Sequence, residues 1–390
     1  MFPCYFSQGS LQNELNTYFA NFYPDVISSQ HIDKSAYSHA RKKYKYEVYQ
    51  KLNDVFVDGY YSIPDIIQSF YGFNVFGVDG SLIALPNDEK IIEEFGVWKA
   101  RNADSAPRGR VSTFFDCLNE ISLESYLVPK SRGERDLAAL HIMFRRFNEN
   151  DIVVYDRGYA SICLQKRHLD MGLHFCMRMP TTWGIIKNFI SDETSNDRIV
   201  TVYPSNSSQK NCIEQNLSPE PYKIRLIKIK LESGITEVLA TSLFSANYDI
   251  IFFKKLYQLR WNTEENYKSV KNKVKIEKFM GKTVKAVYQE FYARMFMLNV
   301  SSAIKNMAQI EIKQKKIKTK KKKYEYKINF KATLSKIRKY GAKLFYGGIE
   351  ILKKIIIIVM EDNDNPIRPG RKYSRNKKNV TAYHQTYSDI

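Results

Sequence analysis

The chain has 390 residues, of which 61 are Lys or Arg and 41 are Asp or Glu, so its formal net charge is +20 at pH 7. This length supports a sizeable core and two or three domains. A charge of this size favours a polyanionic partner, with nucleic acid as the first candidate and an anionic membrane surface as the second.

The sequence argues against a membrane partner. The first ten residues lack the basic-then-apolar order of a secretory signal. The longest apolar run, "IIIIVM" at 355–360, is far shorter than the roughly 20 residues that a membrane-spanning helix needs. The five cysteines are scattered without a CxxC pair, which predicts neither a disulfide framework nor a structural zinc site. We therefore expect a reduced, cytoplasmic protein.

Residues 1–70 are predicted to form a helical region, because apolar and aromatic residues recur at helical spacing over 35–56. The pattern then changes, and "FNVFGVDGSLIALP" (73–86) predicts two short strands around a turn at Asp79-Gly80. A third strand is expected within 113–130. Helix and strand then alternate over four stretches: 133–147, 151–160, 161–171 and 173–180. This order predicts an α/β fold with a mixed sheet.

Short β-like runs broken by a polar loop (204–218) predict a β-rich insertion at 181–247. Helices are expected from 248, over 286–304 and over 331–360. The Lys-rich tract at 311–328 is typical of a solvated segment, and beside DNA it would also supply sequence-independent phosphate contacts. We therefore predict three parts: a helical DNA-binding region (1–70), a catalytic core (71–310) and a basic C-terminal region (311–390).

The stretch "YQLRWNTEENYKSVK" (257–271) contains no Gly or Pro and is predicted to be one helix. On such a helix Tyr257, Arg260, Glu264 and Lys271 fall within an arc of roughly 60°. Taken alone, this polar stripe would be a solvated face.

Two aspartates give the stripe a second interpretation. Asp79 and Asp156 each end an apolar run, "NVFGVD" and "IVVYD". Each alone is typical of a turn residue, and Glu264 alone of an exposed helix carboxylate. If the two strands are neighbours, all three carboxylates meet at one sheet edge, where they would repel one another unless cations lie between them. Oxygen ligands without His or Cys favour Mg²⁺ or Mn²⁺, and two such ions are suited to attack on a phosphodiester.

At this point the chain resembles the IS-four family of bacterial insertion-sequence transposases, a branch of the DDE transposases. Residues 257–271 match that family's Y-x2-R-x3-E-x6-K signature, and "VDGS" (78–81) and "DRGYA" (156–160) resemble its two aspartate blocks. "EKFMGKT" (277–283) and "IRPGRKYSR" (367–375) also resemble segments that recur in the family.

The resemblance implies a ribonuclease-H-like core with a β-rich insertion, flanked by helical N- and C-terminal regions. It also implies a catalytic, metal-binding triad of Asp79, Asp156 and Glu264, which would use two ions of Mg²⁺ or Mn²⁺. The enzyme would nick the ends of an insertion sequence in double-stranded DNA and join the freed 3′-hydroxyl to target DNA, as a homodimer on that DNA.

The resemblance assigns transposon-end DNA contacts to Tyr257, Arg260 and Lys271. Two further residues have open alternatives. Arg178 could face DNA or form a structural salt bridge. Trp183 could stack on a flipped base or belong to the core.

The whole chain also has alternatives to an active transposase. It could be a catalytically inactive, transposase-derived DNA-binding protein, or a metal-dependent nuclease of the same fold. A basic scaffold protein on RNA or a membrane is disfavoured by the three carboxylates.

Overall fold

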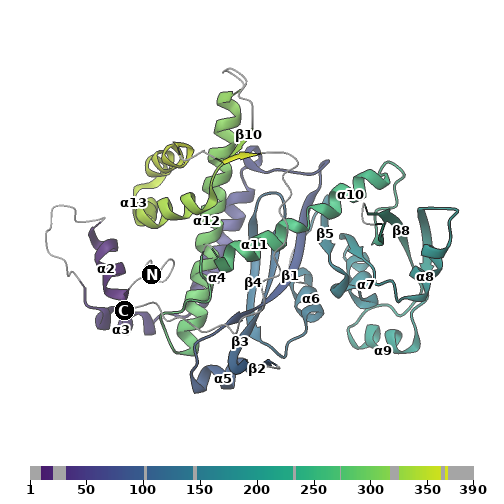
Figure 1. The fold of residues 1–390 in the computed structure, drawn as a ribbon, viewed down its shortest axis with the longest axis horizontal. Helices are drawn as coiled ribbons and strands as arrows, with labels where there is room; N and C mark the ends of the chain where they lie inside the picture. Colours follow the sequence, from purple (N-terminus) through teal and green to yellow (C-terminus); the bar gives the residue numbers. More distant parts are fainter. Residues whose placement is uncertain are drawn as a thin grey trace.

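The computed structural model describes residues 10–20, 32–100, 103–143, 147–231, 234–272, 274–316, 325–361 and 365–367. At its centre is a sheet of nine strands within these residues (Figure 1). The strands of this sheet are β1 (Asn74–Ala84), β2 (Val97–Ala100), β3 (Ala103–Asp116), β4 (Ile121–Pro129), β5 (Asp151–Tyr155), β6 (His174–Arg178), β7 (Asp197–Val202), β8 (Tyr222–Lys230) and β9 (Thr236–Thr241). A separate two-stranded pair joins β10 (Glu325–Lys327) to β11 (Asn365–Ile367).

The strand directions identify the architecture. β3 runs antiparallel to both β1 and β4, whereas β5 pairs parallel to β1, and β6 pairs parallel to β5. The order β4-β3-β1-β5-β6, with three antiparallel strands followed by two parallel ones, is that of a ribonuclease-H-like core. The predicted mixed α/β sheet is therefore confirmed.

The first strand differs from its prediction. β1 does not turn at Asp79-Gly80 but continues as one strand, because every residue from Phe76 to Ala84 pairs with a residue of β3. The hairpin turn lies instead between β3 and β4, where Glu120 adopts a φ of 56°. Asp79 is therefore in the middle of a strand and not at its end.

Helices cover both faces of the sheet. The first four helical elements are α2 (Leu11–Ala20), α3 (Lys34–Lys42), α4 (Glu47–Tyr61) and η1 (Pro64–Ile66). Four helical elements lie between the first six strands along the chain: α5 (Glu89–Phe95), α6 (Glu134–Met143), η2 (Arg157–Tyr159) and α7 (Ile162–Asp170). The remaining helices are α8 (Gly184–Ser191), α9 (Asn206–Glu214), α10 (Ile250–Gln258), α11 (Trp261–Asn272), α12 (Val284–Lys316) and α13 (Phe330–Glu361).

Side chains alternate between these two layers of helices. Along β1, Val75 belongs to the apolar cluster that contains α10, whereas Val78 belongs to the cluster that contains α6 and α7. β5 follows the same alternation with Val154 and Val153. Because successive side chains of a strand point to opposite faces, residues 75, 77 and 79 face the side of α10 and α11. In Figure 1, α10 and α11 cross in front of the sheet.

The region between β6 and α10 extends the sheet. β9 pairs antiparallel with β6, and β8 and β7 follow outward. The predicted polar loop at 204–218 instead contains α9, whose N-terminus is capped by the Ser205 side chain and whose Cys212 is buried. The few apolar residues of α9 gave no helical periodicity to detect.

Two long helices complete the molecule. α12 packs against α4, β4 and α13, and the Asn299 amide on α12 donates to the Ser122 carbonyl on β4 at 2.7 Å. The division of the chain at 70 and 310 stays a prediction. Residues 317–324 of the Lys-rich tract and 368–390 of the tail lie outside the described residues. No helix in the described ranges is long and apolar enough to cross a membrane.

Candidate active site

Backbone register brings the two aspartates together. β1 and β5 pair in parallel, with Gly77 opposite Val154. Asp79 and Asp156 each follow two residues later, so both side chains leave the sheet on the face that carries α10 and α11. Neighbouring strands lie about 4.8 Å apart, which sets the spacing of the two backbones.

Close packing of α11 on β1 brings in the third carboxylate. A Cβ atom added to Gly77 would come within 2.5 Å of the Thr263 hydroxyl, so only glycine leaves room for the helix at this crossing. The Asn262 amide donates to the carbonyl of Cys117 at 2.7 Å and fixes the start of the helix. Glu264 is the next residue after Thr263, on the same first turn of α11.

The electrostatics of Asp79 indicate that the three carboxylates interact. Burial and, to a lesser extent, the negative charges of Glu264 and Asp156 raise its pKa. Against the opposing effects of the Gly80 amide and Arg260, the result is a pKa of about 6. A carboxyl group held near two others is a poor anion in the absence of a nearby cation.

Asp156 has the opposite balance. Burial opposes its ionisation, but the Arg157 backbone amide and the charges of Arg178 and Arg260 lower its pKa. The Arg178 guanidinium lies 2.8 Å from its carboxylate, and the Tyr257 hydroxyl donates to the same oxygen at 3.4 Å. Asp156 is therefore a stable anion at neutral pH.

The predicted single helix over 257–271 is wrong. α10 ends at Gln258 and α11 begins at Trp261, with Leu259 and Arg260 in a turn between them. The Arg260 amide bonds the Tyr257 carbonyl three residues back, at 3.1 Å, in place of the i−4 bond of an α-helix. The turn nevertheless leaves Arg260 next to Glu264, with Nη2 2.7 Å from Oε1.

The structure provides partners within the chain for two other predicted DNA contacts. The Lys271 ammonium donates to the Leu82 carbonyl of β1 at 2.8 Å, and burial lowers its pKa. Arg178 forms the structural salt bridges that were its alternative role, to Asp156 and to Glu237 of β9. Its side chain is still 27% exposed, so it also faces solvent beside the carboxylates.

Trp183 lies at the N-cap of α8 and packs against the apolar cluster that contains α6 and α7. It also lines a pocket of about 350 Å³, together with Ile162 and the 76% exposed Tyr203. Trp261, by contrast, is 45% exposed, and the Arg260 guanidinium lies 5.4 Å from its ring. Trp261 is therefore a partly exposed neighbour of Arg260 and does not belong to the buried core.

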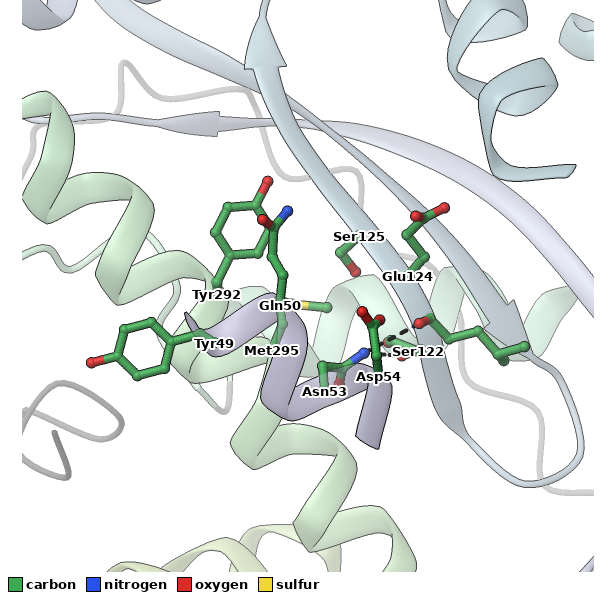
Figure 2. A pocket seen from close by; sticks show the side chains of 10 residues that line it. Tyr49, Gln50, Asn53, Asp54, Ser122, Glu124, Ser125, Tyr292 and Met295 are labelled. Atoms are coloured by element: carbon green, nitrogen blue, oxygen red, sulfur yellow. Dashed lines mark hydrogen bonds between the residues drawn. The ribbon is translucent and has the colours of Figure 1, made fainter. Parts of the chain in front are cut away.

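A second pocket lies between α4, β4 and α12 (Figure 2). Its volume is about 240 Å³, below the range typical of ligand sites, and Asn53 crosses it to hydrogen-bond the carbonyls of Ser122 and Leu123. These bonds hold α4 on the sheet, and no residue of the triad lines this pocket.

Mg²⁺ and Mn²⁺ prefer carboxylate oxygens, so the triad is a suitable donor set. In the described part of the chain, however, no group of three acidic, His or Cys side chains converges closely enough to hold an ion. Glu264 is paired with Arg260 and Asp156 with Arg178. The donor chemistry fits a divalent ion, and the carboxylates would have to turn from these arginines to hold one.

Sequence reasoning missed two supporting residues. Gly77 precedes Asp79 by two residues on the same strand face, and this spacing was the available signal that a helix crosses closely there. Glu237, which holds Arg178, has no local signal because it comes from a strand 59 residues further along the chain.

A protein-family model identifies the family of this chain. None of the curated proteins searched matches the chain. A cryo-EM structure of the piggyBac transposase synaptic complex with hairpin DNA is similar at 9% sequence identity and a TM-score of 0.42, covering 77% of this chain and 59% of that one. The model of the transposase DDE domain matches residues 70–300, well over half of the chain and the whole of the site. The chain therefore belongs to the family of transposase DDE domain proteins.

Proposed function

We propose that the protein is a DNA transposase that nicks the ends of an insertion sequence and joins the 3′-hydroxyl to target DNA. Membership of the DDE transposase family implies an enzyme that cleaves and transfers DNA. The observation that carries the proposal is the parallel register of β1 and β5. It sets Asp79 and Asp156 side by side under the helix that carries Glu264.

The three carboxylates are proposed to hold two ions of Mg²⁺ or Mn²⁺, as DDE transposases generally use divalent metals. When bound, such ions activate the attacking oxygen and stabilise the leaving one. The roles of the chain's own residues follow from their chemistry. Asp79 and Asp156 would hold the ions from the sheet, and Glu264 would hold them from the helix.

The basic residues around the triad are proposed to position DNA. Arg260 can form a bidentate contact to a phosphate, Lys271 and Arg178 add positive charge, and Tyr257 can donate its hydroxyl. Trp183 is proposed to stack on a base beside the cut, because it lines a pocket that has an aromatic ring, Tyr203, among its other lining residues. Because two transposon ends must meet, the working form is proposed to be a homodimer on DNA.

A cleavage assay tests the proposal. Purified full-length protein is mixed with a labelled duplex carrying one end of the element, with Mg²⁺ or Mn²⁺. We expect a metal-dependent nick at the 3′ boundary of the end. Glu264→Gln should abolish the nick while retaining duplex binding, because its carboxylate repels phosphate.

Glu265→Gln is the matched control, because it removes a neighbouring exposed carboxylate from the same helix and should still cleave. Tight duplex binding without a nick, in both metals and with both ends present, would identify an inactive DNA-binding relative. Cleavage without joining to target DNA would instead identify a nuclease.

A further inference from the structure

One guanidinium, that of Arg260, interacts with all three carboxylates of the triad. It forms an ion pair with Glu264 at 2.7 Å, and its charge lowers the pKa of both Asp79 and Asp156. The Arg260 side chain is only 6% exposed. Arginine is rarely buried unless its charge is paired, so this ion pair is what allows the burial. It is therefore a buried cation that is paired with one carboxylate of the triad and acts electrostatically on the other two.

Two aromatic rings also contact Arg260. The guanidinium carbon lies 5.6 Å from the centre of the Tyr257 ring and 5.4 Å from that of Trp261, both within cation–π distance. Tyr257 also donates its hydroxyl to Asp156, so the ring that contacts the arginine is tied to a second carboxylate.

The hold on Arg260 is nevertheless incomplete. Its Nε atom is buried and makes no hydrogen bond within the described part of the chain. The residue also lies in the turn between α10 and α11, so its backbone belongs to neither helix. Burying a donor without a partner is unfavourable, because the donor gives up its hydrogen bonds to water. A phosphate oxygen, which accepts from guanidinium groups bidentately, would provide the missing partner.

We propose that Arg260 is a built-in counter-cation that competes with divalent metal for the triad, and that a DNA phosphate draws it away from Glu264. This inference rests on the proposed function, because it assigns metal and DNA to this site. Metal binding is thereby coupled to DNA binding: without DNA the arginine neutralises the carboxylates, and with DNA they become free to hold ions. An allosteric coupling of this kind is typically worth a factor of 5 to 150 in affinity.

The test measures Mn²⁺ binding by electron paramagnetic resonance of full-length protein, with and without a duplex carrying one end of the element. Mn²⁺ bound to the duplex alone is subtracted. For the wild-type chain we expect weak binding that the duplex strengthens about tenfold or more. For Arg260→Gln we expect tight binding without the duplex and little further gain when it is added.

Arg260→Lys is the matched variant, because it keeps the positive charge and should keep Mn²⁺ binding weak without DNA. It also covers the case in which Arg260→Gln does not fold, since a lysine variant that binds Mn²⁺ as tightly as the DNA-bound wild type would overturn the inference. Equal or weaker Mn²⁺ binding by a folded Arg260→Gln would overturn it as well.

Failure of the proposed function gives a different result. Asp156→Asn then leaves Mn²⁺ binding unchanged, because the triad does not hold metal. Wild-type binding that Asp156→Asn abolishes, but that does not respond to Arg260→Gln, supports the metal site and refutes only the role of the arginine.

Discussion

Replacing Asp79 by Asn should stabilise the metal-free protein above about pH 6, although the same change removes a proposed metal ligand. Burial and the neighbouring carboxylates raise the pKa of Asp79 from 3.8 to about 6. The folded state therefore binds a proton that the unfolded state releases. The stability that this proton provides is complete below pH 3.8 and is lost as the pH rises through 6.

The expected size follows from that shift. A change from 3.8 to about 6 corresponds to about 3 kcal/mol at neutral pH, and partial solvent access reduces this to roughly 1–3 kcal/mol. Asn cannot ionise, so the variant avoids the free-energy cost of burying the ionised Asp79 carboxylate in the folded state. Its advantage should therefore be present at pH 8 and absent near pH 4.

The measurement is thermal unfolding in EDTA at both pH values, with Asp156→Asn as the control. The pKa of Asp156 is lowered, so its stabilising contribution is present above pH 3.8 and lost as the pH falls. At pH 8 the two variants should shift the melting temperature in opposite directions. A lower melting temperature for Asp79→Asn at pH 8 would refute the raised pKa of Asp79.

Gly77→Ala should abolish or strongly reduce cleavage and lower the free energy of unfolding by about 1–3 kcal/mol, because its Cβ would meet the Thr263 hydroxyl. Gly158→Ala is the control, because open space surrounds its Cβ, and it should leave cleavage and unfolding unchanged. Arg225→Met should destabilise the protein by about 3–5 kcal/mol in thermal unfolding, because the buried guanidinium holds a carboxylate and three backbone carbonyls. Burial lowers the pKa of His168 to about 3, so the melting temperature should fall as the pH is lowered from about 6.5 to 3. His168→Gln should make that fall shallower, and an unchanged slope would contradict the lowered pKa of His168.

The meeting of the two aspartates could be predicted from the sequence, because both follow apolar runs that become neighbouring strands. The continuation of β1 through Asp79-Gly80 could not be predicted from the sequence. Asp-Gly has a strong local preference for turns, but full pairing of β1 with β3 outweighs it. The preference was real and the tertiary context overrode it.

The proximity of Arg260 and Glu264 could also be predicted, because the turn at residues 259–260 preserves it. The turn itself could not, since no Gly or Pro marks it. It is fixed by contacts distant in sequence, such as the bond from Asn262 to the Cys117 carbonyl. The pairing of Arg178 with Asp156 was likewise hidden, because only the assembled sheet brings β6 beside β5.

The three carboxylates differ in how freely their positions can vary. Asp79 and Asp156 are spaced by the hydrogen bonds of paired strands, which substitutions elsewhere can hardly alter. Glu264 depends on the seating of one short helix over Gly77, after a turn that interrupts the helical backbone. Variation that tunes the enzyme's rate or metal preference is therefore expected to accumulate in α11 and the residues beneath it, while the strands remain a fixed reference.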